Sequence, residues 1–199
     1  RRGPRRERNG PAPSLPLFYA NPMSQELKQN FFELFGLPAR FAIDGEQLDR
    51  AYRDIQASVH PDRFVNAGEA ERCVSMQQAT HVNEAYQALK NPIQRAAYLL
   101  RLNGIDPRFE TNTAMPAGFL VEQMERREAV EEASDAADAH ELDHLSTRLN
   151  AELRRMVGEI GRQLDESGDY HGAAETLRKL MFLDKVGIEI GDALDALEN

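Results

Sequence analysis

Tryptophan is absent from this sequence of 199 residues, and Cys73 is its only cysteine. A lone cysteine excludes a disulfide within the chain and any zinc site built from several cysteines, and it is typical of a reducing compartment. The sequence also lacks an uninterrupted apolar run of the roughly 18 residues that a membrane-spanning helix requires. We therefore expect no metal cluster based on cysteine and no membrane partner.

Aromatic residues make up only 7% of the chain, and valine and isoleucine are sparse beside alanine, leucine, glutamate and arginine. This composition favours helices over strands, and no alternating strand pattern competes with it. Residues 115–199 carry 20 acidic and 9 basic side chains. Nucleic-acid binding needs basic side chains that neutralise phosphates, so we expect an all-α protein with no nucleic-acid partner.

The first 22 residues differ from the remainder, because arginine, proline and glycine dominate them without helical spacing. Such a composition cannot bury a core. We interpret residues 1–22 as a disordered or non-native N-terminal extension. In the second case the native chain would begin at Met23.

Helical spacing begins soon afterwards. We expect a short helix near Asn30 and a longer one that starts at Asp44, with Asp44 as N-cap and Gln47 as its capping-box partner. Apolar residues then recur every three or four positions, which predicts one buried helical face, at Leu48, Tyr52, Ile55 and Val59. Further helices are expected over residues 69–89 and 93–102.

We expect a linker at residues 103–115, where apolar periodicity is lost, and a second domain at 116–199. Its three amphipathic stretches predict an antiparallel three-helix bundle. The first stretch covers about residues 116–139. Its apolar members are Phe119, Leu120, Met124 and Val130. The second runs from Leu142 to Leu164, and the third begins near Tyr170.

A tripeptide, His60-Pro61-Asp62, separates the two long helices of the first domain, which we place at residues 23–102. A tight loop can present the imidazole, the rigid ring and the carboxylate together, which suits docking to a polar cleft on a partner. Arg50, Arg53 and Arg63 add a positive strip. The plainer alternative is a loop histidine beside a proline that ends a helix. Catalysis is disfavoured, because no serine or cysteine stands out as a partner for His60.

The flanking segments resemble the J-domain family. Residues 31–38 (FFELFGLP) resemble its opening helix, and residues 82–89 (VNEAYQAL) its third-helix signature. Val59 replaces the usual aromatic residue before the histidine, and Arg63 replaces the usual lysine. The C-terminal half resembles the HscB branch of that family, the J-proteins of iron–sulfur cluster assembly. The motifs that carry this likeness are RAAYLL at 95–100, FLVEQME at 119–125 and RKLMFLDK at 178–185.

This resemblance implies a co-chaperone rather than an enzyme, without a cofactor or bound metal of its own. His60, Pro61 and Asp62, with the arginines, would bind a DnaK-like ATPase chaperone such as HscA. The C-terminal bundle would bind the scaffold protein IscU. The client-binding residues implied by the resemblance are Leu120, Val121, Met124, Glu125, Glu128, Glu132 and Phe182. We expect a monomer in the bacterial cytoplasm, with the mitochondrial matrix as the alternative location.

Three alternatives stay open at this point. Periodicity alone favours Leu120, Met124 and Phe182 as bundle core rather than a binding surface. The chain could be a general J-domain co-chaperone for a different client. Finally, His140 and His144 have the helical spacing of a metal-binding pair, although no third ligand is evident, and a helical enzyme or metal carrier would use them.

Overall fold

The computed structural model describes residues 29–60, 62, 68–106 and 115–198, and every regular element in these ranges is helical. The elements are α2 (Phe31–Leu34), α3 (Gly45–Val59), α4 (Glu69–Lys90), α5 (Pro92–Leu102), α6 (Ala117–Asp135), α7 (Ala139–Arg162), the π turn η3 (Gln163–Ser167) and α8 (Tyr170–Glu198). The expected extension at residues 1–22 and most of the expected linker lie outside the described residues.

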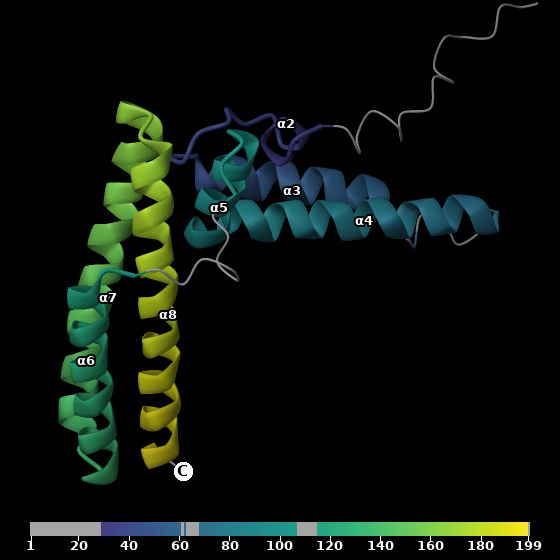
Figure 1. Ribbon diagram of the computed structural model, residues 1–199. Coiled ribbons are helices and arrows are strands. Elements are labelled where there is room, and N and C mark those ends of the chain that lie inside the picture. Colours follow the sequence, from purple (N-terminus) through teal and green to yellow (C-terminus); the bar gives the residue numbers. More distant parts are fainter. Residues whose placement is uncertain (1–28, 61, 63–67, 107–114, 199) are drawn as a thin grey trace, which may run out of the picture.

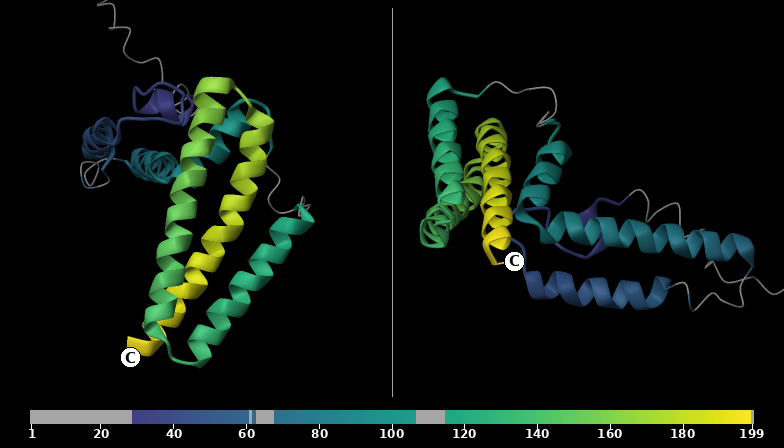
Figure 2. Two further views of the ribbon diagram at one scale, coloured as in Figure 1. Left: turned by 90° about the vertical axis from the view of Figure 1, so that its left-hand side faces the viewer. Right: turned by 90° about the horizontal axis from the view of Figure 1, so that it is seen from below.

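The molecule is L-shaped (Figure 1). α3 and α4 form an antiparallel hairpin that points away from an upright bundle of α6, α7 and α8, and α2 and α5 lie at the root of the hairpin (Figures 1 and 2). α5 packs against both α4 and α8, whereas α6 contacts both α7 and α8. The expected fold, a J-domain followed by a three-helix bundle, is confirmed.

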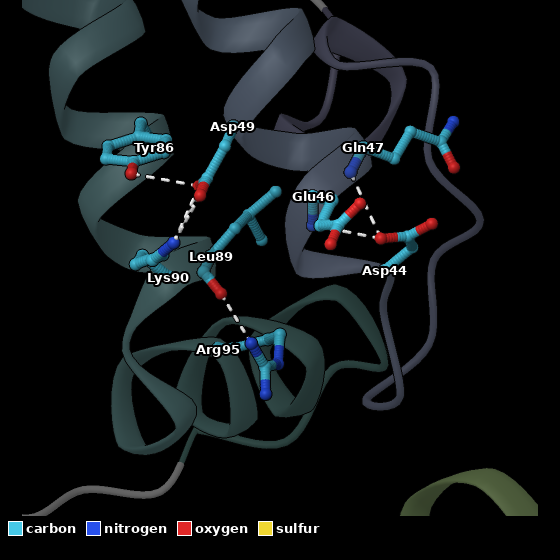
Figure 3. Close-up of polar contacts among 8 residues, drawn as sticks. All are labelled: Asp44, Glu46, Gln47, Asp49, Tyr86, Leu89, Lys90 and Arg95. Carbon is cyan, nitrogen blue, oxygen red and sulfur yellow. Dashed lines mark hydrogen bonds and ion pairs between the residues drawn. The ribbon is translucent and has the colours of Figure 1, made fainter.

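The start of α3 follows the expected N-cap but not the expected capping box. The Asp44 carboxylate accepts hydrogen bonds from the backbone N–H groups of Glu46 and Gln47, at 2.9 and 3.1 Å (Figure 3). The prediction for the Gln47 side chain is wrong, because its amide donates to the carbonyl of Gly36 at 3.4 Å. Gly36 has a positive φ of 63°, and the tight turn that it allows brings this carbonyl within reach.

A polar cluster joins the root of α3 to the end of α4. The Asp49 carboxylate accepts from the Tyr86 hydroxyl at 3.0 Å and from the Lys90 ammonium at 2.6 Å (Figure 3). The hydrogen bond from Lys90 is the largest influence on Asp49 and lowers the pKa of its carboxyl group. The Tyr86 ring stacks on Tyr52 with centroids 4.0 Å apart. These contacts fix the hairpin beside its apolar core, in which Phe32, Leu48, Leu89 and Leu100 are fully buried.

In the bundle, α7 and α8 form the tightest pair, and their buried residues include Leu142, Ile160, Leu177 and Leu183. The expected first stripe is partly wrong, because Leu120 and Met124 face outward, with 40% and 71% of their surfaces exposed. Val130 lies eleven positions after Phe119 and therefore on the same side of the helix. Leu120 follows Phe119 directly and is rotated from it by about 100° around the helix axis. The buried residues of α6 are Gln123, Val130 and Ala133.

The first bundle helix is also shorter than expected. α6 ends at Asp135, and Ala137 adopts a positive φ of 50° in the turn that follows. Asp138 then caps α7 by accepting from the backbone N–H of Glu141 at 3.0 Å. The acidic stretch that follows Glu131 therefore contains a helical hairpin.

Candidate functional site

The first candidate surface lies at the free end of the hairpin, where α3 stops (Figure 1). His60 is the C-cap of α3, and its side chain and that of Asp62 are 52% and 85% exposed. The backbone N–H of Asp62 donates to His60 Nδ1 at 3.2 Å. The same nitrogen lies 3.6 Å from the Asp62 carboxylate, so the two side chains stand close together. An imidazole that accepts at Nδ1 can donate to a partner only from Nε2. The loop therefore presents an imidazole and a carboxylate to solvent, side by side.

A buried hydroxyl fixes the point at which this loop leaves α3. Ser75 of α4 is 1% exposed, and its Oγ donates to the carbonyl of Val59 at 2.7 Å. Carbonyls in the last turn of a helix lack partners within the helix, so this bond holds the end of α3 against α4. Ser75 is not among the residues predicted from the sequence. The sequence signal that could have identified it is a small polar residue one helical turn before Ala79, on the side of α4 that faces the core.

The predicted positive strip is only partly described. Arg50 and Arg53 are exposed on α3, whereas Pro61 and Arg63 lie outside the described residues. Arg50 pairs with Glu46 one turn earlier, at 3.6 Å, and both side chains are more than half exposed. Such a pair contributes little to stability, so Arg50 remains available to a partner. The role of these residues in chaperone binding stays a prediction.

A second hydrogen-bonded group holds α3 to α4 near Arg53. The Tyr52 hydroxyl donates to Asn83 Oδ1 at 2.9 Å, and the Gln56 amide donates to the Tyr52 hydroxyl at 3.1 Å. Asn83 belongs to the third-helix motif on which the resemblance rests. Its contact shows what that motif does physically, because it fixes the register of the two helices that carry the loop.

The second candidate surface is the outward side of α6. Val121 and Met124 are 53% and 71% exposed. Glu125, Glu128 and Glu132 are exposed on the same side of the helix. The interpretation of Leu120 and Met124 as bundle core is therefore wrong. Instead, α6 presents a small apolar patch with carboxylates along one edge, which we call the α6 face.

Phe182 of α8 forms the flank of the α6 face. Its ring is half-buried and meets Phe119 edge to face, with centroids 5.9 Å apart. The guanidinium of Arg127 lies 5.3 Å from the centre of the ring and forms an ion pair with Glu189 at 2.9 Å. Arg127 is not among the residues predicted from the sequence. It holds an aromatic side chain in one orientation between two helices, which lowers the entropy lost when a partner contacts the ring.

The two arginines of α6 reach toward the neighbouring helices, which leaves the α6 face acidic. Arg126 pairs with Glu152 of α7, and Arg127 pairs with Glu189 of α8. By contrast, the predicted client-binding glutamates form no ion pair with the described residues; they are Glu125, Glu128 and Glu132. An uncompensated acidic edge around an apolar centre fits a partner that carries basic and apolar groups.

The described residues offer no metal site. Within them, no group of three or more histidine, cysteine, aspartate or glutamate side chains comes together in a way that could hold a metal ion. His140 and His144 are exposed on α7, and His144 lies 3.9 Å from Glu141. Cys73 is exposed on α4. No helix in the described part of the chain is long and apolar enough to cross a membrane.

Known proteins match this chain in its C-terminal half and also along most of its length. Residues 115–191 match the family described as the HSCB C-terminal oligomerisation domain. The co-chaperone protein HscB homolog of Aromatoleum aromaticum is 51% identical over 176 residues, which cover 88% of this chain and 99% of that protein. The HscB homolog of Burkholderia thailandensis is 51% identical over 173 residues, which cover 87% and 98% of the two chains.

Solved structures share the same architecture. The chaperone HscB from Vibrio cholerae is 39% identical, with a TM-score of 0.75, and the match covers 85% of this chain and 99% of that one. The human co-chaperone protein HscB is 27% identical, also with a TM-score of 0.75, over 96% and 93% of the two chains. With a J-domain hairpin, the bundle behind it and relatives matched almost from end to end, this chain belongs to the HscB family of co-chaperones.

Proposed function

We propose that this protein stimulates ATP hydrolysis by a DnaK-like chaperone of the HscA type and delivers to it an IscU-type scaffold protein of iron–sulfur cluster assembly. The observation that carries the proposal is the pairing of two exposed surfaces on one molecule. A hairpin tip presents His60 and Asp62, and a separate helix presents an apolar patch with an acidic edge. We place this activity in a bacterial cytoplasm, because the curated relatives are bacterial.

At the hairpin tip, the proposed contact is polar and directional. The exposed Nε2–H of His60 can donate to an acceptor on the chaperone, while the Asp62 carboxylate can accept from a basic group. Charge-assisted bonds of this kind are short and strong. Arg50 and Arg53 would add long-range attraction to an acidic partner, which mainly raises the association rate. Pro61 and Arg63 complete the proposed chaperone-binding set.

This role asks for no bond-breaking chemistry in the chain itself. ATP, its metal ion and the hydrolytic step belong to the chaperone. The J-domain would act by binding the hydrolysis-competent form of that ATPase better than other forms, since a partner shifts an equilibrium only by its difference in affinity.

On the α6 face, Val121, Met124 and Phe182 would form the buried centre of the client interface, with Leu120 beside them. Interfaces concentrate their binding energy in a few central apolar and aromatic residues, surrounded by a polar rim. Glu125, Glu128 and Glu132 would form one side of that rim. They would select a client with basic residues and orient it.

A second copy of the chain is a poorer occupant of the α6 face. In a symmetric dimer the same patch lies on both subunits, so the interface would hold two copies of the acidic edge formed by Glu125, Glu128 and Glu132. Like charges across an interface cost several kcal/mol. We therefore propose that the protein is a monomer, which light scattering coupled to size-exclusion chromatography tests directly.

Steady-state ATP hydrolysis by the matching HscA-type chaperone tests the proposed function. This protein and the IscU-type scaffold are added singly and together. We expect the rate with both to exceed clearly the rate with either alone. Stimulation by this protein that ignores the scaffold would leave a J-domain co-chaperone with a different client. No stimulation in any mixture would refute the chaperone assignment.

A further inference from the structure

One carboxylate joins the two halves of the molecule. Asp165 lies in the π turn at the end of α7, and its side chain is only 8% exposed. Its Oδ1 accepts from the backbone N–H of Phe41 at 2.7 Å, and its Oδ2 accepts from that of Ala42 at 2.8 Å. The guanidinium of Arg40 lies 3.5 Å from the same carboxylate. These three acceptor contacts reach the segment that leads into α3 of the J-domain.

The packing around this carboxylate is close. The Phe41 ring is 6% exposed and rests on α7 at Gly161. A Cβ atom at Gly161 would stand 3.1 Å from the ring, which is too near for an unshifted contact. The guanidinium of Arg95, on α5, lies 4.8 Å from the centre of the same ring. Bundle, loop and J-domain helix therefore meet on one aromatic side chain.

The Asp165 carboxylate also compensates the positive charge of Arg95, which is partly buried. Arg95 donates to the carbonyl of Leu89 at 2.6 Å (Figure 3), and its Nε is buried without a partner. Burial lowers the pKa of Arg95, and the negative charge of Asp165 opposes that effect. Removing Asp165 would leave a partly buried cation with less compensation, as well as two backbone donors without their acceptor.

From this geometry we propose that Asp165 is a positioning residue that sets the angle between the J-domain and the client-binding bundle. The other contacts between the halves are those of α5 with α8 and α7. The buried residues of α5 are all apolar, and apolar contact is not directional. A carboxylate that binds two successive N–H groups is directional, because both oxygens are engaged at once.

This positioning role would couple the two proposed binding surfaces. α8 lies between α5 and α6, so α8 separates the helix that carries the α6 face from the root of the hairpin (Figure 2). The angle at Asp165 then decides where the client stands relative to His60 when the chaperone binds the tip. This consequence rests on the proposed function, whereas the angle itself does not.

Asp165→Asn is the first test, with Glu166→Gln as the matched control. Both changes remove one negative charge from the same turn, but Glu166 is exposed and takes part in none of the contacts described. The asparagine amide can accept only at its oxygen, so one backbone N–H loses its acceptor. Spin labels are attached to Cys73 and to an introduced Ala151→Cys, both at exposed positions. Double electron–electron resonance then measures the distance between the labels, which reports the angle between the two domains in the absence of any partner.

We expect a narrow distance distribution for the parent and for Glu166→Gln, and a broader or shifted one for Asp165→Asn. Gly161→Leu provides an independent wedge on the other side of Phe41. It should shift the same distribution while circular dichroism shows an intact helical fold. Unchanged distributions in both Asp165→Asn and Gly161→Leu would overturn the proposal.

Function provides the second readout. Asp165→Asn should keep its scaffold affinity and its stimulation of the chaperone alone to within about twofold, as expected for a site remote from both surfaces. The extra stimulation with scaffold present should fall by about fivefold, the size of a modest coupling between sites. A shifted distance with full joint stimulation would overturn the coupling. If the parent gives no stimulation at all, the proposed function fails, while the distance measurement still decides the role of Asp165.

Discussion

Truncation of Met124 gives the sharpest test of the α6 face. The side chain is 71% exposed in the free protein, so Met124→Ala should leave the free energy of unfolding within about 0.5 kcal/mol of the parent value. Complete burial of a methionine side chain contributes about 1.5 to 3 kcal/mol. Scaling by the exposed fraction, burial under a client would contribute about 1 to 2 kcal/mol. Its loss corresponds to a Kd for the scaffold that is raised about 5-fold to 30-fold.

Met76 supplies a control of the same residue type. It is 61% exposed on α4, on the J-domain and away from the α6 face. Met76→Ala should therefore leave the Kd for the scaffold unchanged. Titration calorimetry measures both affinities, and thermal unfolding checks that both variants stay folded. An unchanged Kd for folded Met124→Ala, or an equal loss for Met76→Ala, would refute the assignment of the client surface.

Three further results are expected. His60→Gln should abolish stimulation of the chaperone ATPase while scaffold affinity and the helical circular dichroism signal stay unchanged; unfolding of this variant would instead make the loop structural. Glu128→Gln should slow association with the scaffold and weaken its salt dependence, as stopped-flow measurements at two ionic strengths would show, because exposed rim charges act mainly on the association rate. The hydrogen bond from Lys90 lowers the pKa of Asp49 in the folded state, so its stabilising effect is present above the unfolded pKa of about 3.9 and is lost as the pH falls through the folded value. The stability difference between the parent and Asp49→Asn should therefore shrink below about pH 4 in acid denaturation, and a constant difference would argue against this ion pair.

Periodicity was sufficient to predict most of the fold. The starts of α3 and α5 follow local signals, the Asp44 cap and the Asn91 cap with Pro92 after it, which act within a few residues. The outward turn of Met124 could not be predicted from periodicity alone, because α6 carries apolar residues on two sides. Only the packing of Phe119 and Val130 decides which side is buried.

The residues that position the two surfaces were also beyond sequence reasoning. Ser75 and Arg127 act on residues of other helices, and Asp165 acts on a loop 124 residues earlier in the chain. A serine or an aspartate carries no local signal of such a partner. The loop at His60 could be recognised, by contrast, because its residues are contiguous and its flanking helices have strong periodic patterns.

The π turn at the end of α7 gives the molecule a sensitivity to chain length. A π-helical hydrogen bond spans one residue more than an α-helical one, so such a turn has the geometry of a single inserted residue. Deleting Gln163 would restore the α-helical register and rotate Asp165 by about 100° around the axis of α7. Its carboxylate would then face away from Phe41 and Ala42. The deletion of this one residue would therefore remove the hydrogen bonds through which Asp165 joins the bundle to the J-domain.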